Sequence, residues 1–117
     1  MSIRQNQKLG DEGLDTVGAT VTLVTNAGTL AKRAGTITTE ALTTAAGVAQ
    51  ALVLTFSELA VGDLVFLSRM GGTSDEGTLE ALNGVITADT LTITLENRHA
   101  SAAFDGTFII AYLIVKA

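Results

Sequence analysis

The sequence predicts an all-β fold, either an antiparallel β-sandwich or a jelly roll, that follows an extended N-terminal arm. Beyond residue 18, short runs of apolar and polar residues alternate with the period of two that is typical of strands. Turn residues, with Gly prominent among them, separate these runs at intervals of about 8 to 14 residues, as in sandwiches and barrels. The 117 residues are enough for one domain with a hydrophobic core.

Residues 1–18 form the predicted arm, and residues 19–117 form the predicted domain. The arm has no sustained apolar period, so it buries little by itself and we expect it to dock on a partner. We expect the contacts with that partner to come from its charged residues, which are Arg4, Lys8, Asp11, Glu12 and Asp15.

The first half of the domain predicts three strands, in each of which side chains alternate between two faces. In the third strand, for example, Leu52, Leu54 and Phe56 share one face. The three strands cover residues 19–25, 30–44 and 50–56, with turns at residues 26–28 and 45–47.

An alternative for residues 40–53 is a helix, which would make the domain α+β. Their apolar residues also fit one face of a helix. Because Thr43, Thr44 and Gly47 disfavour a helix, we prefer the strand interpretation.

The second half of the domain predicts four more strands. The clearest alternation places Leu91, Ile93 and Leu95 inward and the intervening Thr residues outward. Ser57 is a candidate cap for a single helical or 3₁₀ turn in the connector before these strands. The strands cover residues 64–70, 78–87, 90–96 and 108–115, with a connector at residues 57–63, a loop at residues 71–77 and a tight link at residues 88–90.

The last predicted strand, residues 108–115, is apolar on both faces. This pattern is typical of a strand in the middle of a sheet that is covered on both sides, and we expect the two covers to be the opposite sheet and a neighbouring subunit. The run is far shorter than the ~20 residues of a membrane helix. We assign the oligomer interface to one face of this strand, formed by Phe108, Ile110, Tyr112 and Ile114.

Composition excludes several functional classes. The formal net charge of −5 opposes attraction to phosphate backbones, so we expect no nucleic-acid partner. The chain has no Cys, and therefore no thiol nucleophile or disulfide framework. We also expect no membrane partner, and the N-terminus lacks a signal-peptide pattern, which predicts synthesis in a cytoplasm.

No residue pattern indicates catalysis, and we expect no enzymatic activity. His99 is the only histidine, so a triad would have to combine it with neighbours such as Ser101 and Asp105. There is no Gly-x-Ser-x-Gly elbow, and we interpret His99 as a loop residue that hydrogen-bonds backbone groups.

Two acidic segments and one Gly pair are the remaining candidates for ligand sites. Residues 11–15 and 75–77 carry carboxylates that are suitable for Ca²⁺, but neither segment has EF-hand spacing. Residues 71–74 lack the Gly-Lys-Ser/Thr of a phosphate loop. We therefore predict no metal ion and no cofactor.

Two segments resemble parts of a group of small structural proteins of tailed bacteriophages. They are residues 35–47 (GTITTEALTTAAG) and 97–107 (NRHASAAFDGT), and the first 34 residues add nothing to the resemblance. In that group the Asn-x-His-Ala-Ser-Ala-Ala segment is a structural corner. Asn97 and His99 match it, which implies that both side chains satisfy buried backbone polar groups.

The resemblance implies a virion component, which the acidic β-domain, the arm and the doubly apolar strand also favour. We expect a capsid decoration protein, also called a cement protein. Such a protein binds the major capsid protein on the outside of the shell and stabilises it, as a homo-oligomer with a homotrimer favoured. The alternatives are a tail, fibre or head-spike module, and a non-viral protein- or carbohydrate-binding β-domain. The scarcity of Trp and Tyr disfavours sugar stacking.

Overall fold

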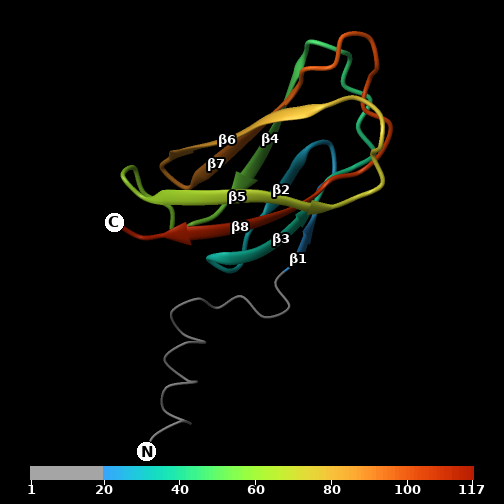
Figure 1. The fold of residues 1–117 in the computed structure, drawn as a ribbon. Coiled ribbons are helices and arrows are strands. Elements are labelled where there is room, and N and C mark those ends of the chain that lie inside the picture. The colour runs from blue at the N-terminus through green and yellow to red at the C-terminus, as the bar shows by residue number, and fades with distance from the viewer. Residues whose placement is uncertain (1–19) are drawn as a thin grey trace, which may run out of the picture.

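The computed structural model describes residues 20–117, except for the side chain of Ala81. The predicted partner contacts of the arm at Arg4, Lys8, Asp11, Glu12 and Asp15 lie outside the described residues. The described chain forms eight strands: β1 (Thr20–Thr22), β2 (Ala27–Thr29), β3 (Ala34–Thr38), β4 (Ala49–Thr55), β5 (Leu64–Gly71), β6 (Leu79–Thr87), β7 (Thr90–Asn97) and β8 (Ile109–Val115) (Figure 1).

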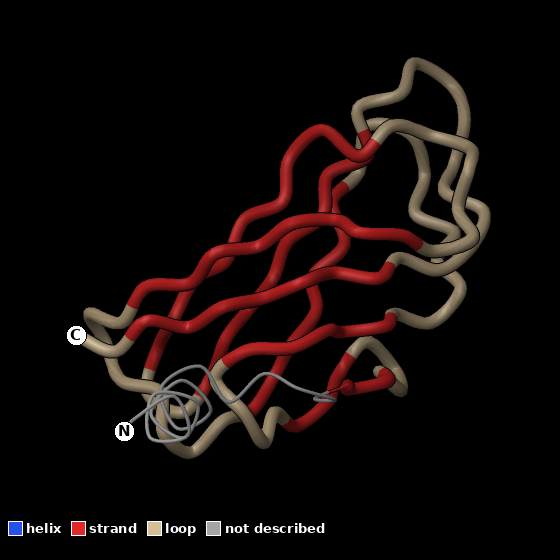
Figure 2. Tube along the Cα trace, turned by 60° about the horizontal axis from the view of Figure 1, so that its bottom comes forward, coloured by secondary structure: helices blue, strands red, loops and turns tan. Residues whose placement is uncertain are grey.

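The eight strands form two four-stranded sheets that stack on each other (Figures 1 and 2). Sheet A has the order β1-β3-β8-β5, and sheet B has the order β2-β4-β7-β6. The predicted all-β fold is confirmed, and the stacked sheets match the predicted sandwich. Within residues 20–117 there is no helix long and apolar enough to cross a membrane.

Two edge pairs are parallel, so both sheets are mixed, whereas the sequence predicted antiparallel sheets. Strand β1 pairs with β3 in parallel, and β2 pairs with β4 in parallel. Both pairs have the same origin, because from β1 to β4 the chain changes sheet and direction at every turn. Two strands of one sheet that are separated by a strand of the other sheet therefore run the same way. The other four pairs are antiparallel.

The strand predicted for residues 30–44 is much shorter in the structure. Strand β3 ends at Thr38, and the Thr39 hydroxyl then accepts a hydrogen bond from the backbone N–H of Phe108 at 2.9 Å. The first turn also lies earlier than predicted, at Thr25 and Asn26, which have φ values of 54° and 58°. The connector at residues 57–63 forms hydrogen-bonded turns. In the segment for which a helix was the alternative, residues 40–48 form a loop and residues 49–53 belong to β4.

The core lies between the two sheets and follows the predicted alternation of the strands. In β7, the inward residues Leu91, Ile93 and Leu95 are fully buried, as predicted. The Thr residues between them are half-buried on the opposite face. The inner faces of the two sheets contribute Leu52, Leu54, Leu91, Ile93 and Leu95 from sheet B, and Ile37, Ile110, Tyr112 and Ile114 from sheet A.

Strand β8 lies in the middle of sheet A, as predicted, but the interface assignment was wrong. Phe108, Ile110, Tyr112 and Ile114 are only 0–3% exposed, because they form the row of side chains that packs inside the chain itself. The Tyr112 hydroxyl donates a 2.8 Å hydrogen bond to the Lys32 carbonyl, which satisfies its polar end. These four side chains are therefore unavailable to a neighbouring subunit.

The C-terminal end of β8 is held by Asp63, in the connector between β4 and β5. The Asp63 side chain is 2% exposed and pairs with Lys116. It also accepts hydrogen bonds from the backbone N–H groups of Ala117 and Ala60, both at 3.0 Å. The hydrogen bond from Lys116 is the largest cause of the lowered pKa of Asp63, which is about 2. The ionised carboxylate thus ties the end of the chain to this connector.

We expect this tie to make stability depend on pH in the acid range. The folded state holds the pKa of Asp63 at about 2, below its ordinary value of 3.8. The stabilisation is therefore present above about pH 4 and lost as the pH falls toward 2. Asp63→Asn should lower Tm at neutral pH and flatten the acid loss of Tm, measured by thermal unfolding across this range. Asp89→Asn, the same charge change at an exposed turn, is the control, and equal behaviour of the two variants would contradict the tie.

Candidate functional site

The longest loops of the described chain gather at one end of the sandwich, away from the C-terminus (Figure 2). They comprise residues 39–48, 72–78 and 98–108. Backbone and side-chain hydrogen bonds join the three loops to one another. This loop end contains Asn97 and His99, the two residues for which the resemblance to phage structural proteins implies a structural corner.

Asn97 is completely buried and uses its whole amide group on backbone partners. Its Oδ1 accepts hydrogen bonds from the backbone N–H groups of Thr78 and His99, both at 3.1 Å. Its Nδ2 donates to the carbonyls of Thr44 at 3.0 Å and Ala102 at 2.9 Å. One side chain thus joins all three loops at the point where β7 ends.

His99 fixes the next turn of the same loop. Its Nδ1 accepts hydrogen bonds from the backbone N–H groups of Ser101 at 3.0 Å and Ala102 at 2.8 Å. This is the kind of backbone hydrogen bonding that the sequence led us to expect of Asn97 and His99. Asp105, the carboxylate considered for a triad, instead accepts hydrogen bonds from the backbone of a different loop.

The side chains around the corner are also closely packed. Gly77 has φ +78°, and a Cβ added to it would lie 2.8 Å from the Phe104 ring and 3.1 Å from Nδ2 of Asn97. Phe104 meets Phe108 edge to face at 4.8 Å, and the Arg69 guanidinium lies 4.4 Å from the centre of the Phe108 ring. Such ring contacts stabilise beyond the area that they bury. The loop end is therefore a rigid extension of the core.

Three carboxylates meet at the tip of the loop end. Asp75, Glu76 and Asp105 each offer an oxygen within 4.8 Å of the others. Asp105 accepts the backbone N–H groups of Glu76 at 3.1 Å and Asp75 at 2.8 Å, which lower its pKa. Hydrogen bonding to Asp105 and its charge raise the pKa of Asp75. The backbone hydrogen bonds to Asp105 hold the loop at residues 75–76. The sequence placed Asp105 only beside His99 and missed this contact, because Asp105 lies about thirty residues from the pair.

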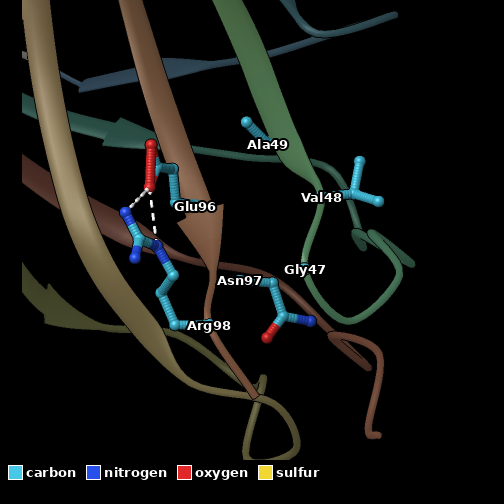
Figure 3. Close-up of a pocket in the computed structure, with 6 residues that line it drawn as sticks. All are labelled: Gly47, Val48, Ala49, Glu96, Asn97 and Arg98. Carbon is cyan, nitrogen blue, oxygen red and sulfur yellow. Dashed lines mark hydrogen bonds and ion pairs between the residues drawn. The ribbon is translucent and has the colours of Figure 1, made fainter. Parts of the chain in front are cut away.

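A polar recess of about 310 Å³ lies beside the corner (Figure 3). The Glu96 carboxylate and the Arg98 guanidinium form an ion pair at 2.6 Å on one side of it. Figure 3 shows the Asn97 amide pointing away from this pair, toward the loop that carries Gly47. The charges in the recess cancel, and its remaining lining residues are Gly47, Val48 and Ala49.

The most exposed group of large apolar side chains lies on the outer face of sheet A. Leu64, Phe66 and Met70 of β5 are 57%, 58% and 61% exposed, and Val115 of β8 is 42% exposed. With the half-buried Ile109, Ala111 and Leu113 of β8, these four residues form what we call the β5/β8 face. Pairing of Leu64 with Val115 and of Phe66 with Leu113 makes the face continuous. A shallow apolar depression of about 220 Å³ lies on it between Phe66 and Leu113.

The outer face of sheet B has a different chemistry. Its central strand presents Thr90, Thr92 and Thr94, which are half-buried. Its large exposed apolar side chains are Val53 and Val85, which lie on either side of Thr92 in the sheet. Hydroxyl groups in such a row keep a sheet face hydrated, so the outer face of sheet A is the more apolar of the two.

The two segments that carry the resemblance to phage structural proteins contact each other in the structure. The backbone N–H of Leu42 donates to the Gly106 carbonyl at 2.8 Å, and that of Gly47 donates to the Asn97 carbonyl at 2.7 Å. No protein-family model matches the chain, and no curated protein or solved structure is significantly similar to it. The functional conclusion therefore depends on the residues themselves.

Loss of the Asn97 amide should destabilise the domain strongly. Asn97→Ala removes four hydrogen bonds to loop backbone, one of them buried and three part-buried, although the Thr44 carbonyl keeps the Phe104 N–H as a partner. We therefore expect the free energy of unfolding to fall by about 3 kcal/mol. Asn97→Asp keeps the acceptor and loses the donor, so its loss should be smaller in acid, where the protonated carboxyl can donate. Denaturant unfolding measures both variants. A change below about 1 kcal/mol in Asn97→Ala would contradict the corner.

Substitutions of His99 should show whether its Nδ1 acceptor stabilises the loop end. The accepting Nδ1 is bonded to Cγ, so Asn places its Oδ1 nearly where the structure needs an acceptor, whereas Ala places none. We expect His99→Asn to be close to wild type in stability and His99→Ala to lose about 1–2 kcal/mol, measured by denaturant unfolding. Equal losses in the two variants would show that the two hydrogen bonds to Nδ1 contribute nothing.

Proposed function

We propose that the protein is a capsid decoration protein, which binds the outside of a phage shell as a small homo-oligomer and stabilises it. The observation that carries the proposal is the β5/β8 face, where large apolar side chains up to 61% exposed are gathered on a rigid domain. Contiguous apolar surface of this kind marks interaction sites on soluble proteins. A protein that functions as part of an assembly can bury such a face against its neighbours.

The loop end supports a structural role in a second way. Asn97, His99 and Asp105 are the polar side chains that a catalytic or ligand-binding site would need, and each one hydrogen-bonds loop backbone. These polar groups therefore hold the loop backbone in place. A cement protein depends on shape of this kind, because it must fit the shell at many equivalent places.

The stabilisation itself would follow from mass action. A protein that binds the assembled shell but not the free subunits favours the shell by RT ln(1 + [L]/Kd) for each site. Repetition over a whole lattice multiplies this effect, and contacts that span neighbouring subunits add avidity. Moderate affinity at each site is therefore sufficient.

Attachment to the major capsid protein is assigned to the arm in this proposal. Residues 21–114 supply the hydrophobic core of the described part of the chain. The arm carries the charged residues Arg4, Lys8, Asp11, Glu12 and Asp15 and has no sustained apolar period. Their mixed charge suits contacts with the polar outer surface of a shell.

A tail, fibre or head-spike module is the second candidate. The observation that favours it is the rigid loop end, which presents exposed Asp75, Glu76 and Arg98 from a stable scaffold, as receptor-reading loops do. Gold labelling of the protein on the particle distinguishes the two candidates. Label spread over the shell supports decoration, and label confined to the tail or to spikes supports the second candidate.

Removal of residues 1–18 should weaken attachment without unfolding the domain. We expect an almost unchanged Tm, because the arm has no sustained apolar period with which to enter a core, and a reduced occupancy on shells. The measurement is co-sedimentation of the purified protein with shells from the capsid encoded by the same genome, with the full-length chain as the control. Unfolding of the truncated protein would contradict the domain boundary, and undiminished binding would contradict the role of the arm.

A further inference from the structure

The β5/β8 face has three properties that together indicate what covers it. The first is the absence of charge among the described outward residues of sheet A. These are Leu64, Phe66, Ser68 and Met70 of β5, the odd-numbered residues 109–115 of β8, Ala34, Thr36 and Thr38 of β3, and Thr20 and Thr22 of β1. A nucleic acid or a strongly charged protein finds no complementary group on this face. Two copies of a chain with net charge −5 can meet on it without placing like charges in contact.

The second property is a gradient of side-chain size across the sheet. Large side chains project from β5, where Phe66 is 58% exposed, whereas β3 on the other side of β8 carries only Ala34, Thr36 and Thr38 on this face. When two copies meet face to face about a two-fold axis that runs parallel to the strands, the β5 side of one copy lies over the β3 side of the other. Large side chains then meet small ones, so the face is complementary to itself.

The third property is the size of the face. Four strands about 4.8 Å apart and seven residues with a rise of about 3.3 Å give a surface of about 19 by 23 Å. Projecting side chains such as Leu64 and Met70 raise the accessible area above this flat value. The flat value is at most about 440 Å², roughly half of the ~800 Å² per partner of a standard protein–protein contact, so the face suits a contact at the small end of the range.

We infer that the β5/β8 face is the contact between copies of this chain, with Phe66 as its aromatic anchor. Phe66 lies midway along the edge strand β5, borders the apolar depression and pairs with Leu113 of the central strand β8. Buried aromatic anchors of this kind carry a large share of the binding energy of interfaces. This inference rests on the homo-oligomer of the proposed function and moves the interface from the inner row of β8 to the outer row.

The test compares charged substitutions at matched positions on the two sheets. Phe66→Lys and Leu64→Lys place an ammonium group in the β5/β8 face. Val85→Lys places the same group on the outer face of sheet B, at a residue that is 60% exposed and also lies on an edge strand. Sedimentation equilibrium of the full-length protein at about ten micromolar gives the oligomeric state, and thermal unfolding shows that each variant is folded.

We expect the wild-type protein and Val85→Lys to be oligomers of the same size. Each β5 variant should dissociate, with a dissociation constant raised about thirtyfold or more, the usual effect of losing an anchor residue. A monomeric wild-type protein, undisturbed oligomers of both β5 variants, or equal dissociation of Val85→Lys would overturn the inference. Failure of shell binding by a wild-type oligomer would count against the decoration function and leave this interface intact.

Discussion

The inner row of β8 side chains holds the sandwich together, and the other features depend on it. Ile110, Tyr112 and Ile114 enter one core with Ile93 and Leu95 of the opposite sheet. Burial of each such side chain contributes about 1.5–3 kcal/mol. Because a strand has only two faces, the use of one row inside the chain leaves the other row of β8 outside, and beside it β5 adds Leu64 and Phe66. The interaction that makes the domain fold thus also creates the apolar surface through which we propose that it assembles.

The same core sets the requirements at the loop end. Beyond Phe104 and Phe108 the sheets stop, and three loops pass over the end of the core with backbone groups that no strand can satisfy. The buried Asn97 amide supplies two acceptor and two donor contacts, and Asp105 supplies further acceptors. Unsatisfied buried polar groups are costly, so these side chains are committed to structure. A rigid end of this kind suits a protein that must present one shape repeatedly.

Much of the fold could be predicted from the sequence, because its strands have local patterns. The alternation in β7 correctly predicted that the side chains of Leu91, Ile93 and Leu95 are buried. The apolar run of β8 predicted a central strand but could not say which row faces inward, since both rows are apolar. Residues 64–67 are also apolar without interruption. This run likewise indicated that β5 is apolar on both faces, one of which lies outside the core. The contact of Asp105 with Asp75 and the parallel edge pairs depend on segments far apart in the chain, so no local pattern predicts them.

Cryo-electron microscopy of the particle encoded by the same genome tests the central claim most directly, because it shows where each copy of the chain lies and which face is covered. The account predicts copies on the outer surface of the shell, grouped around a local symmetry axis with their β5/β8 faces turned toward one another. Isolated copies with Phe66 facing solvent, or a chain that is absent from the shell, would contradict it.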